Sequence, residues 1–168
     1  MPCSFILGDD DMQMILKQKF FSWFDRYEIN DESGNLLFIV EGKLSWGHCL
    51  KIHDASHQEI GMVQEKLLSF LPRFELYIEG EHVGTLSKDL SWFRPRYHID
   101  YNGWQVEGDF MGWDYRVLDS SRKEVAVISK ELMHWSDTYE IEVFDPKDAL
   151  GALMIVLSID AEKCSRNE

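Results

Sequence analysis

The sequence predicts a mainly β protein: a closed antiparallel barrel of about twelve strands, in six hairpin repeats, around a buried C-terminal helix. Three observations lead to this fold class. Aromatic residues return about every 22 residues, a short alternating run follows each of them, and the chain ends in a segment that is apolar on every face. A regular period of this length is typical of one supersecondary unit used several times.

The recurring position is a tryptophan in five of its six occurrences. An alternating run begins a few residues after each, as in Tyr27 and Ile29 or Phe74 and Leu76. Residues two apart share one face of a strand, so each run predicts a half-buried strand. We expect the tryptophans to occupy equivalent places at one end of the barrel. The full series is Trp23, Trp46, Phe70, Trp92, Trp113 and Trp135.

A second set of turns falls between these positions. Gly, Asn, Asp and Ser supply positive φ angles or bonds from side chain to backbone, and both features favour tight turns. Each repeat therefore contains two strands and two turns, and closing the sheet into a barrel removes its exposed edges. The turn segments are DESGN at 31–35, HDASHQ at 53–58, EGEH at 79–82, YNG at 101–103 and DSSRK at 119–123.

The segment FDPKDALGALMIVLSIDAEKC predicts the helix. Asp145 can cap it, Pro146 suits its first position, and Asp148 favours its first turn. From Leu150 to Ile159 every face is apolar, but the run is too short to cross a bilayer, so we expect no transmembrane segment. A barrel this wide needs more than strand side chains to fill it, so the helix is expected as its core. The expected core helix residues are Leu150, Leu153, Met154, Ile155 and Leu157.

Length and composition indicate one domain. The chain has 168 residues, of which 45% are hydrophobic, and we expect a flexible tail over 1–11 and a single barrel domain over 12–168. Its net charge of −13 opposes nucleic-acid binding, which requires many lysines and arginines on phosphates. The three cysteines are far apart, which predicts neither a disulfide framework nor a zinc site and favours a reducing cytoplasm.

Several segments in order resemble one known family. These are KQKFFSWFDRYEI, GKLSWGHCLKI, LPRFELYI, WQVEGDFMGWDYRV and the terminal apolar helix. From residue 14 to about 164 they are similar to bacterial members of the LURP-one-related family, in the tubby C-terminal-like group. The resemblance implies a twelve-stranded barrel around a central helix and implies no reaction. Tubby-like relatives bind phosphoinositide headgroups through surface Lys and Arg, and phospholipid scramblases share the fold.

Catalytic and metal-binding patterns are weak. The chain contains none of the motifs GxSxG, GxGxxG, HExxH or the P-loop, so we expect no enzyme, no cofactor and no catalytic residue. The densest set of metal-ligand residues is His48, Cys49, His53 and His57. Because neighbouring strand residues point to opposite faces, these side chains are not expected to converge on a metal ion.

Arginines beside aromatic residues are the candidate anion-binding group. Arg26, Arg73, Arg94 and Arg96 all lie in the connections that carry the tryptophan series. Such arginines can hold a phosphate or carboxylate while the neighbouring ring meets apolar surface. The alternative is that each pairs with a local acid, such as Asp25 or Glu75. The opposite barrel end is expected to be strongly acidic, with a cation site as a weaker hypothesis.

These observations favour a non-enzymatic intracellular binding module. Its partner at one barrel end would be an anionic lipid headgroup or a protein. An enzyme with an unrecognised constellation and a scramblase-like membrane-associated protein are the alternatives. A small-molecule carrier is the least favoured class, because a helix would already occupy the interior of the barrel.

Overall fold

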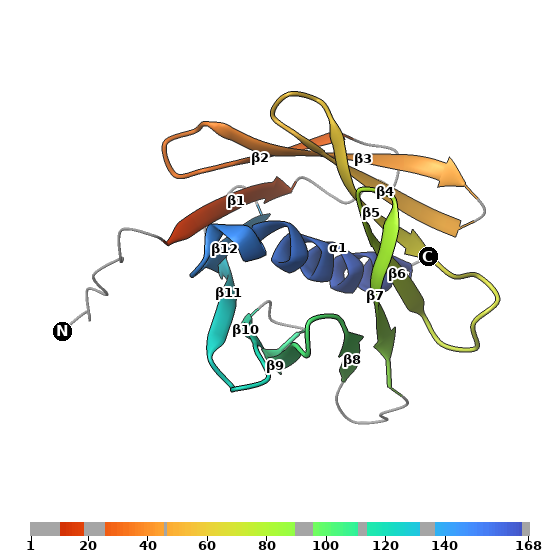
Figure 1. The fold of residues 1–168 in the computed structure, drawn as a ribbon. Coiled ribbons are helices and arrows are strands. Elements are labelled where there is room, and N and C mark those ends of the chain that lie inside the picture. Colours follow the sequence, from red (N-terminus) through yellow and green to blue (C-terminus); the bar gives the residue numbers. More distant parts are fainter. Residues whose placement is uncertain are drawn as a thin grey trace.

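The computed structural model describes residues 11–18, 26–45, 47–89, 96–110, 114–131 and 137–165. Within these ranges the chain forms a large antiparallel sheet wrapped around one long helix (Figure 1). The strands are β1 (Met12–Gln18), β2 (Arg26–Asn30), β3 (Leu36–Ser45), β4 (Gly47–Asp54), β5 (Glu59–Glu65), β6 (Arg73–Ile78), β7 (Glu81–Lys88), β8 (Tyr97–Asp100), β9 (Gln105–Asp109), β10 (Asp114–Leu118), β11 (Glu124–Glu131) and β12 (Asp137–Val143), followed by a short 3-10 turn, η1 (Pro146–Asp148), and α1 (Ala149–Ser165).

The sheet is a meander that closes through its first and last strands. Each strand pairs with its neighbours in the chain, and β1 pairs with β12 over the whole of Met12–Gln18. The order runs β8-β7-β6-β5-β4-β3-β2-β1-β12-β11-β10-β9, so β8 and β9 are the two edges. The predicted twelve-stranded antiparallel barrel is therefore confirmed, with one refinement: it is nearly closed, and a seam remains between β8 and β9.

Three hairpin turns share one local design. In each, an Asp at the end of a strand accepts a hydrogen bond from the backbone N–H four residues later. The residue three positions after the Asp has a positive φ angle. This is the geometry of a turn with one left-handed residue, which matches the twist of the strands it joins. The opening residues are Asp31, Asp54 and Asp119, and the left-handed ones are Gly34, His57 and Arg122.

Helix α1 is enclosed by the sheet. Every residue from 151 to 162 is buried, which is why its sequence is apolar on all faces instead of along one stripe. Four of the five expected core residues, Leu153, Met154, Ile155 and Leu157, have no exposed surface, and Leu150 is partly buried against the same core. No helix in the described part of the chain has the length and hydropathy needed to cross a membrane.

Two aromatic side chains pack against each other at the turn that joins β8 and β9. Asn102 and Gly103 both have positive φ, as in a hairpin turn of type I′, and Trp104 N donates to Tyr101 O over 2.9 Å. The rings of Tyr101 and Trp104 then meet edge to face, 5.0 Å apart. A Cβ at Gly151 would lie 2.8 Å from Tyr101 Cε1, so the helix presents bare backbone to these rings. Trp104, which the repeat did not account for, is thus a core residue.

The structure describes little of the tryptophan series and of the N-terminal tail. Trp23, Trp46, Trp92, Trp113 and Trp135 lie outside the described residues, so their arrangement stays a prediction. The remaining member of the series, Phe70, is described and is 94% exposed. The predicted tail also lies outside the described residues, except for Asp11.

Candidate functional site

Arg26, the first of the candidate arginines, has a local acidic partner. It opens β2 opposite Glu41 of β3, and the two side chains form an exposed ion pair at 4.0 Å. Four strand positions separate β2 from β6, so Arg26 does not lie beside Arg73. The alternative of local pairing therefore holds for Arg26, although Glu41 replaces the expected Asp25, which lies outside the described residues.

Arg73 and Arg96 lie on the outside of the same barrel end. Arg73 opens β6, and Arg96 directly precedes β8, with β7 between the two strands. Each is exposed and is followed by a buried aromatic residue, Phe74 or Tyr97, which points inward. Within the described part of the chain, neither guanidinium has an ion pair. Arg94 lies outside the described residues.

The connection between β5 and β6, residues 66–72, is the most apolar exposed part of the described surface. Leu68 is fully exposed, Phe70 is 94% exposed, and Leu67 is more than half exposed. Lys66 and Arg73 bracket the connection, because Lys66 N donates to Arg73 O at its base. Figure 1 shows this connection projecting beyond the strands. We call residues 66–73 the apolar loop.

Backbone bonds hold the apolar loop in place. Ser69 N donates to Lys66 O over 3.3 Å, and Lys88 N, at the end of β7, donates to Pro72 O over 3.2 Å. Lys66 also pairs with Glu75, whose other oxygen accepts from the Tyr77 hydroxyl. Lys66 and Tyr77 together hold the pKa of Glu75 below its usual value. These bonds hold the backbone of the loop while Leu67, Leu68 and Phe70 remain exposed.

Charged groups are buried directly inside this end of the barrel. Glu162, near the end of α1, is almost fully buried and accepts from Lys88 Nζ at 2.7 Å and from the Tyr97 hydroxyl at 2.8 Å. Lys163, the next residue of the helix, donates to the carbonyl oxygen of Phe110, just beyond edge strand β9. These contacts join the last turn of the helix to both sides of the seam.

Asp160, two residues before Glu162 in α1, is a second buried acidic side chain. It is 4% exposed, and burial raises its pKa to about 8. Burial, followed by the charge of Asp160, also raises the pKa of Tyr115 well above its usual value. Tyr115 belongs to a layer of aromatic residues that point inward near the starts of alternate strands. The layer consists of Tyr27, Phe74, Tyr97, Tyr115 and Tyr139.

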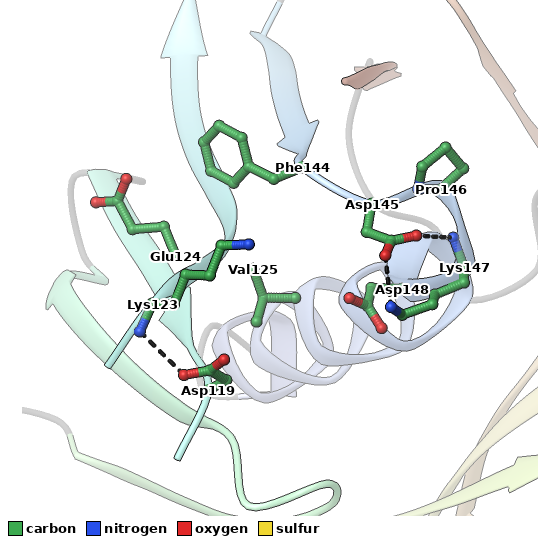
Figure 2. A pocket seen from close by; sticks show the side chains of 9 residues that line it. All are labelled: Asp119, Lys123, Glu124, Val125, Phe144, Asp145, Pro146, Lys147 and Asp148. Atoms are coloured by element: carbon green, nitrogen blue, oxygen red, sulfur yellow. Dashed lines mark hydrogen bonds and ion pairs between the residues drawn. The ribbon is translucent and has the colours of Figure 1, made fainter. Parts of the chain in front are cut away.

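The opposite barrel end carries a hollow of about 480 Å³ (Figure 2). Its carboxylates already have structural tasks: Asp119 closes a hairpin turn, Asp145 caps η1 and pairs with Lys147, and Glu124 pairs with Arg116. Partial burial raises the pKa of Asp148. The lining residues are Asp119, Lys123, Glu124, Val125, Phe144, Asp145, Pro146, Lys147 and Asp148.

The histidine and cysteine cluster does not come together. Cys49 is buried, and burial raises the pKa of its thiol, whereas His48 pairs with Glu65 at 3.5 Å. His57 is exposed in a turn at the far end of β4. In the described part of the chain, no three His, Cys, Asp or Glu side chains are grouped to hold a metal ion.

Sequence reasoning missed two parts of this end. The repeat accounts only for Phe70 in the apolar loop, although four large apolar residues in one short connection, LLSFL, indicate exposed hydrophobic surface; three of the four are exposed. The ion pair of Glu162 with Lys88 joins residues 74 positions apart, and no local pattern indicates it.

Comparisons with known proteins agree with the fold. The family model described as LURP-one-related matches residues 12–160. The chain is 29% identical over 150 residues to the uncharacterized protein YxjI of Bacillus subtilis (strain 168), covering 89% of this chain and 92% of that protein. It is also similar to the X-ray structure of the Arabidopsis thaliana protein AT5G01750, with a TM-score of 0.63, 17% identity, and coverage of 92% of this chain and 94% of that one.

The structural likeness shows the shared barrel, while the family model covers almost the whole sequence from the start of β1 into α1. On that match, the chain belongs to the LURP-one-related family.

Proposed function

We propose that this protein is a non-enzymatic module that binds anionic surface groups at the barrel end formed around Arg73 and Arg96. The observation that carries the proposal is the exposure of two guanidinium groups on the same end, on either side of β7. Arginine binds phosphate and carboxylate oxygens with two parallel hydrogen bonds, which suits a lipid headgroup.

The distribution of charge supports this orientation. The chain carries a net charge of −13, and acidic residues gather in the turns of the opposite end. Charges separated by more than about 8 Å are largely screened at physiological salt, so a local cationic group can act within an acidic protein. The acidic residues of the turns are Asp31, Glu32, Asp54, Glu79, Glu81 and Asp119.

The expected affinity is modest. Each Lys or Arg at an anionic membrane surface contributes about 1 kcal/mol, so two arginines alone give weak attachment that salt reverses. The proposal places the protein in the cytoplasm, where the inner leaflet of the membrane offers anionic lipid.

Sedimentation with vesicles tests the proposal. We expect the protein to pellet with phosphatidylserine-containing vesicles at low salt and to remain in solution with pure phosphatidylcholine. Arg73→Gln with Arg96→Gln should remove binding. Arg116→Gln with Arg122→Gln changes net charge equally at exposed sites near the opposite end and should leave binding intact.

Equal loss in both double variants would mean that net charge alone controls binding, against a defined site. No binding to any anionic vesicle at low salt would reject the lipid function, and a protein partner would then be the leading candidate.

A further inference from the structure

The apolar loop lies at the same barrel end as Arg73 and Arg96 and exposes three large apolar side chains. We infer that it inserts into the interfacial layer of an anionic bilayer, with Leu67, Leu68 and Phe70 as the inserted side chains. This inference rests on the proposed function and names its partner as a bilayer, in place of a soluble anion or a protein.

The exposure of these residues is unusual. In the described part of the chain, they are the large hydrophobic side chains that are most exposed to solvent. Transfer of large apolar side chains such as leucine and phenylalanine from water into an apolar environment is favourable in free energy. The gain requires a partner, since the barrel core and the helix are already packed against each other.

The frame of the loop keeps this surface exposed. The bond from Lys66 N to Arg73 O closes its base, and the bond from Lys88 N to Pro72 O ties it to β7. Leu71 and Pro72 are partly buried, whereas Leu68 and Phe70 stand outward. The backbone of the loop is therefore already ordered, with its apolar side chains in solvent. Because of this, insertion costs little conformational entropy.

Its shape and charge favour a bilayer. The loop projects beyond the strands (Figure 1). A projecting apolar loop can enter a fluid lipid surface without a complementary pocket. Arg73 at its base and Arg96 two strands away would lie at headgroup level when Leu68 and Phe70 lie below it. The acidic turns are at the opposite barrel end, so this orientation also directs them away from an anionic surface.

Fluorescence at the loop tests insertion separately from surface binding. A nitrobenzoxadiazole label on Leu68→Cys, in a Cys3→Ser and Cys164→Ser background, should brighten and shift to the blue with phosphatidylserine vesicles. Cys49 is buried and is not expected to react. The same label on Ser33→Cys, in an exposed turn at the opposite end, should not change.

Soluble glycerophosphoserine distinguishes a bilayer from a free headgroup, and it should leave the Leu68→Cys label unchanged. Leu68→Gln with Phe70→Gln should lower the vesicle partition coefficient by about tenfold or more, because it removes two apolar side chains that leave water on insertion. Leu68→Met with Phe70→Leu should retain most of the binding. Both positions are exposed, so circular dichroism and the melting temperature should match those of the unchanged protein.

Three outcomes overturn the inference. A label at position 68 that stays unchanged on vesicles that pellet the protein would leave surface binding standing and reject insertion. Undiminished partition of Leu68→Gln with Phe70→Gln would do the same. Failure of every anionic vesicle to pellet the protein would reject the proposed function and the inference with it.

Discussion

Lys88, the last residue of β7, donates to the carboxylate of Glu162 at 2.7 Å and so ties the end of the central helix to the wall of the barrel. The Tyr97 hydroxyl bonds the other oxygen of Glu162. Glu162 is 1% exposed, so its charge is held by these donors in a site with almost no water. The contact lies directly inside the end where Arg73 and Arg96 are exposed.

The first prediction concerns this pair. Lys88→Met removes a cationic donor from buried Glu162, and breaking a buried pair in this way costs about 3 kcal/mol. The partial exposure of Lys88 places the effect toward the lower part of the usual range. Urea unfolding at neutral pH measures it. Adding Glu162→Leu to Lys88→Met removes the second charge and should recover much of the lost free energy of unfolding. If the losses of the two single variants simply add in the double variant, the two residues are not coupled.

A second prediction follows from Asp160, whose pKa of about 8 in the folded protein lies above the usual Asp value. The folded state therefore binds its proton more tightly than the unfolded state. Its contribution to stability is complete below about pH 4 and is lost as pH rises toward 8. Between these limits the free energy of unfolding should fall by up to about 1.4 kcal/mol for each pH unit from this group.

Asp160→Asn checks the assignment, because it removes the titrating group and retains the shape. Its unfolding free energy should depend less on pH between 5 and 8 than that of the unchanged protein. Other carboxyls contribute a background: burial also raises the pKa of Glu142 and of Asp148. Identical pH profiles for the two proteins would show that Asp160 is not the source.

The third prediction tests packing at the seam. Gly151→Ala places a methyl group 2.8 Å from Tyr101 and 3.1 Å from Trp104 Cη2. Alanine favours a helix over glycine by about 1 kcal/mol, whereas overpacking a core costs about 1–3 kcal/mol. We expect net destabilisation, measured as a lower melting temperature. In a Tyr101→Ala background the same change should cost less or stabilise, and an equal cost in both backgrounds would exclude the ring contact.

A fourth prediction concerns His57, which has φ of 65° in an exposed hairpin turn. Residues with a Cβ are strained in this region, and the equivalent residue of the β2–β3 turn is Gly34. His57→Gly should raise the free energy of unfolding by about 0.5–1 kcal/mol. Ser56→Gly, one residue earlier, is the matched control and should stabilise nothing. A lower stability for His57→Gly would mean that the imidazole makes a contact outweighing the strain.

Local sequence patterns predict most of the architecture. Alternating runs such as Tyr27 with Ile29 and Phe74 with Leu76 predicted strands, and those side chains are buried as the period requires. Asp31 and Asp119 marked hairpin turns because their side chains bond backbone groups only a few residues away. An apolar run without a polar face predicted an enclosed helix, since only a surrounding sheet can bury every side of it.

Long-range contacts were beyond this kind of reasoning. Nothing near Arg26 in the chain indicates Glu41 as its partner, because cross-strand register depends on how two strands align in space. A seam lies between β8 and β9 although their turn has a favourable Asn-Gly pair, and at this turn the rings of Tyr101 and Trp104 lie close to Gly151 of the helix, a contact that no local pattern indicates.

The repeat predicts the strand count and the turns, and the terminal apolar segment predicts the helix, because strands, turns and helices depend mainly on residues close in the chain. Exposure, ion pairing and burial of charge depend on which distant residues meet. Only the folded chain therefore distinguishes Arg26, which is paired with Glu41, from exposed Arg73. It also encloses Glu162 with Lys88 and leaves Leu68 in water, since the sheet's register and closure bring the first pair together and leave the loop outside the core.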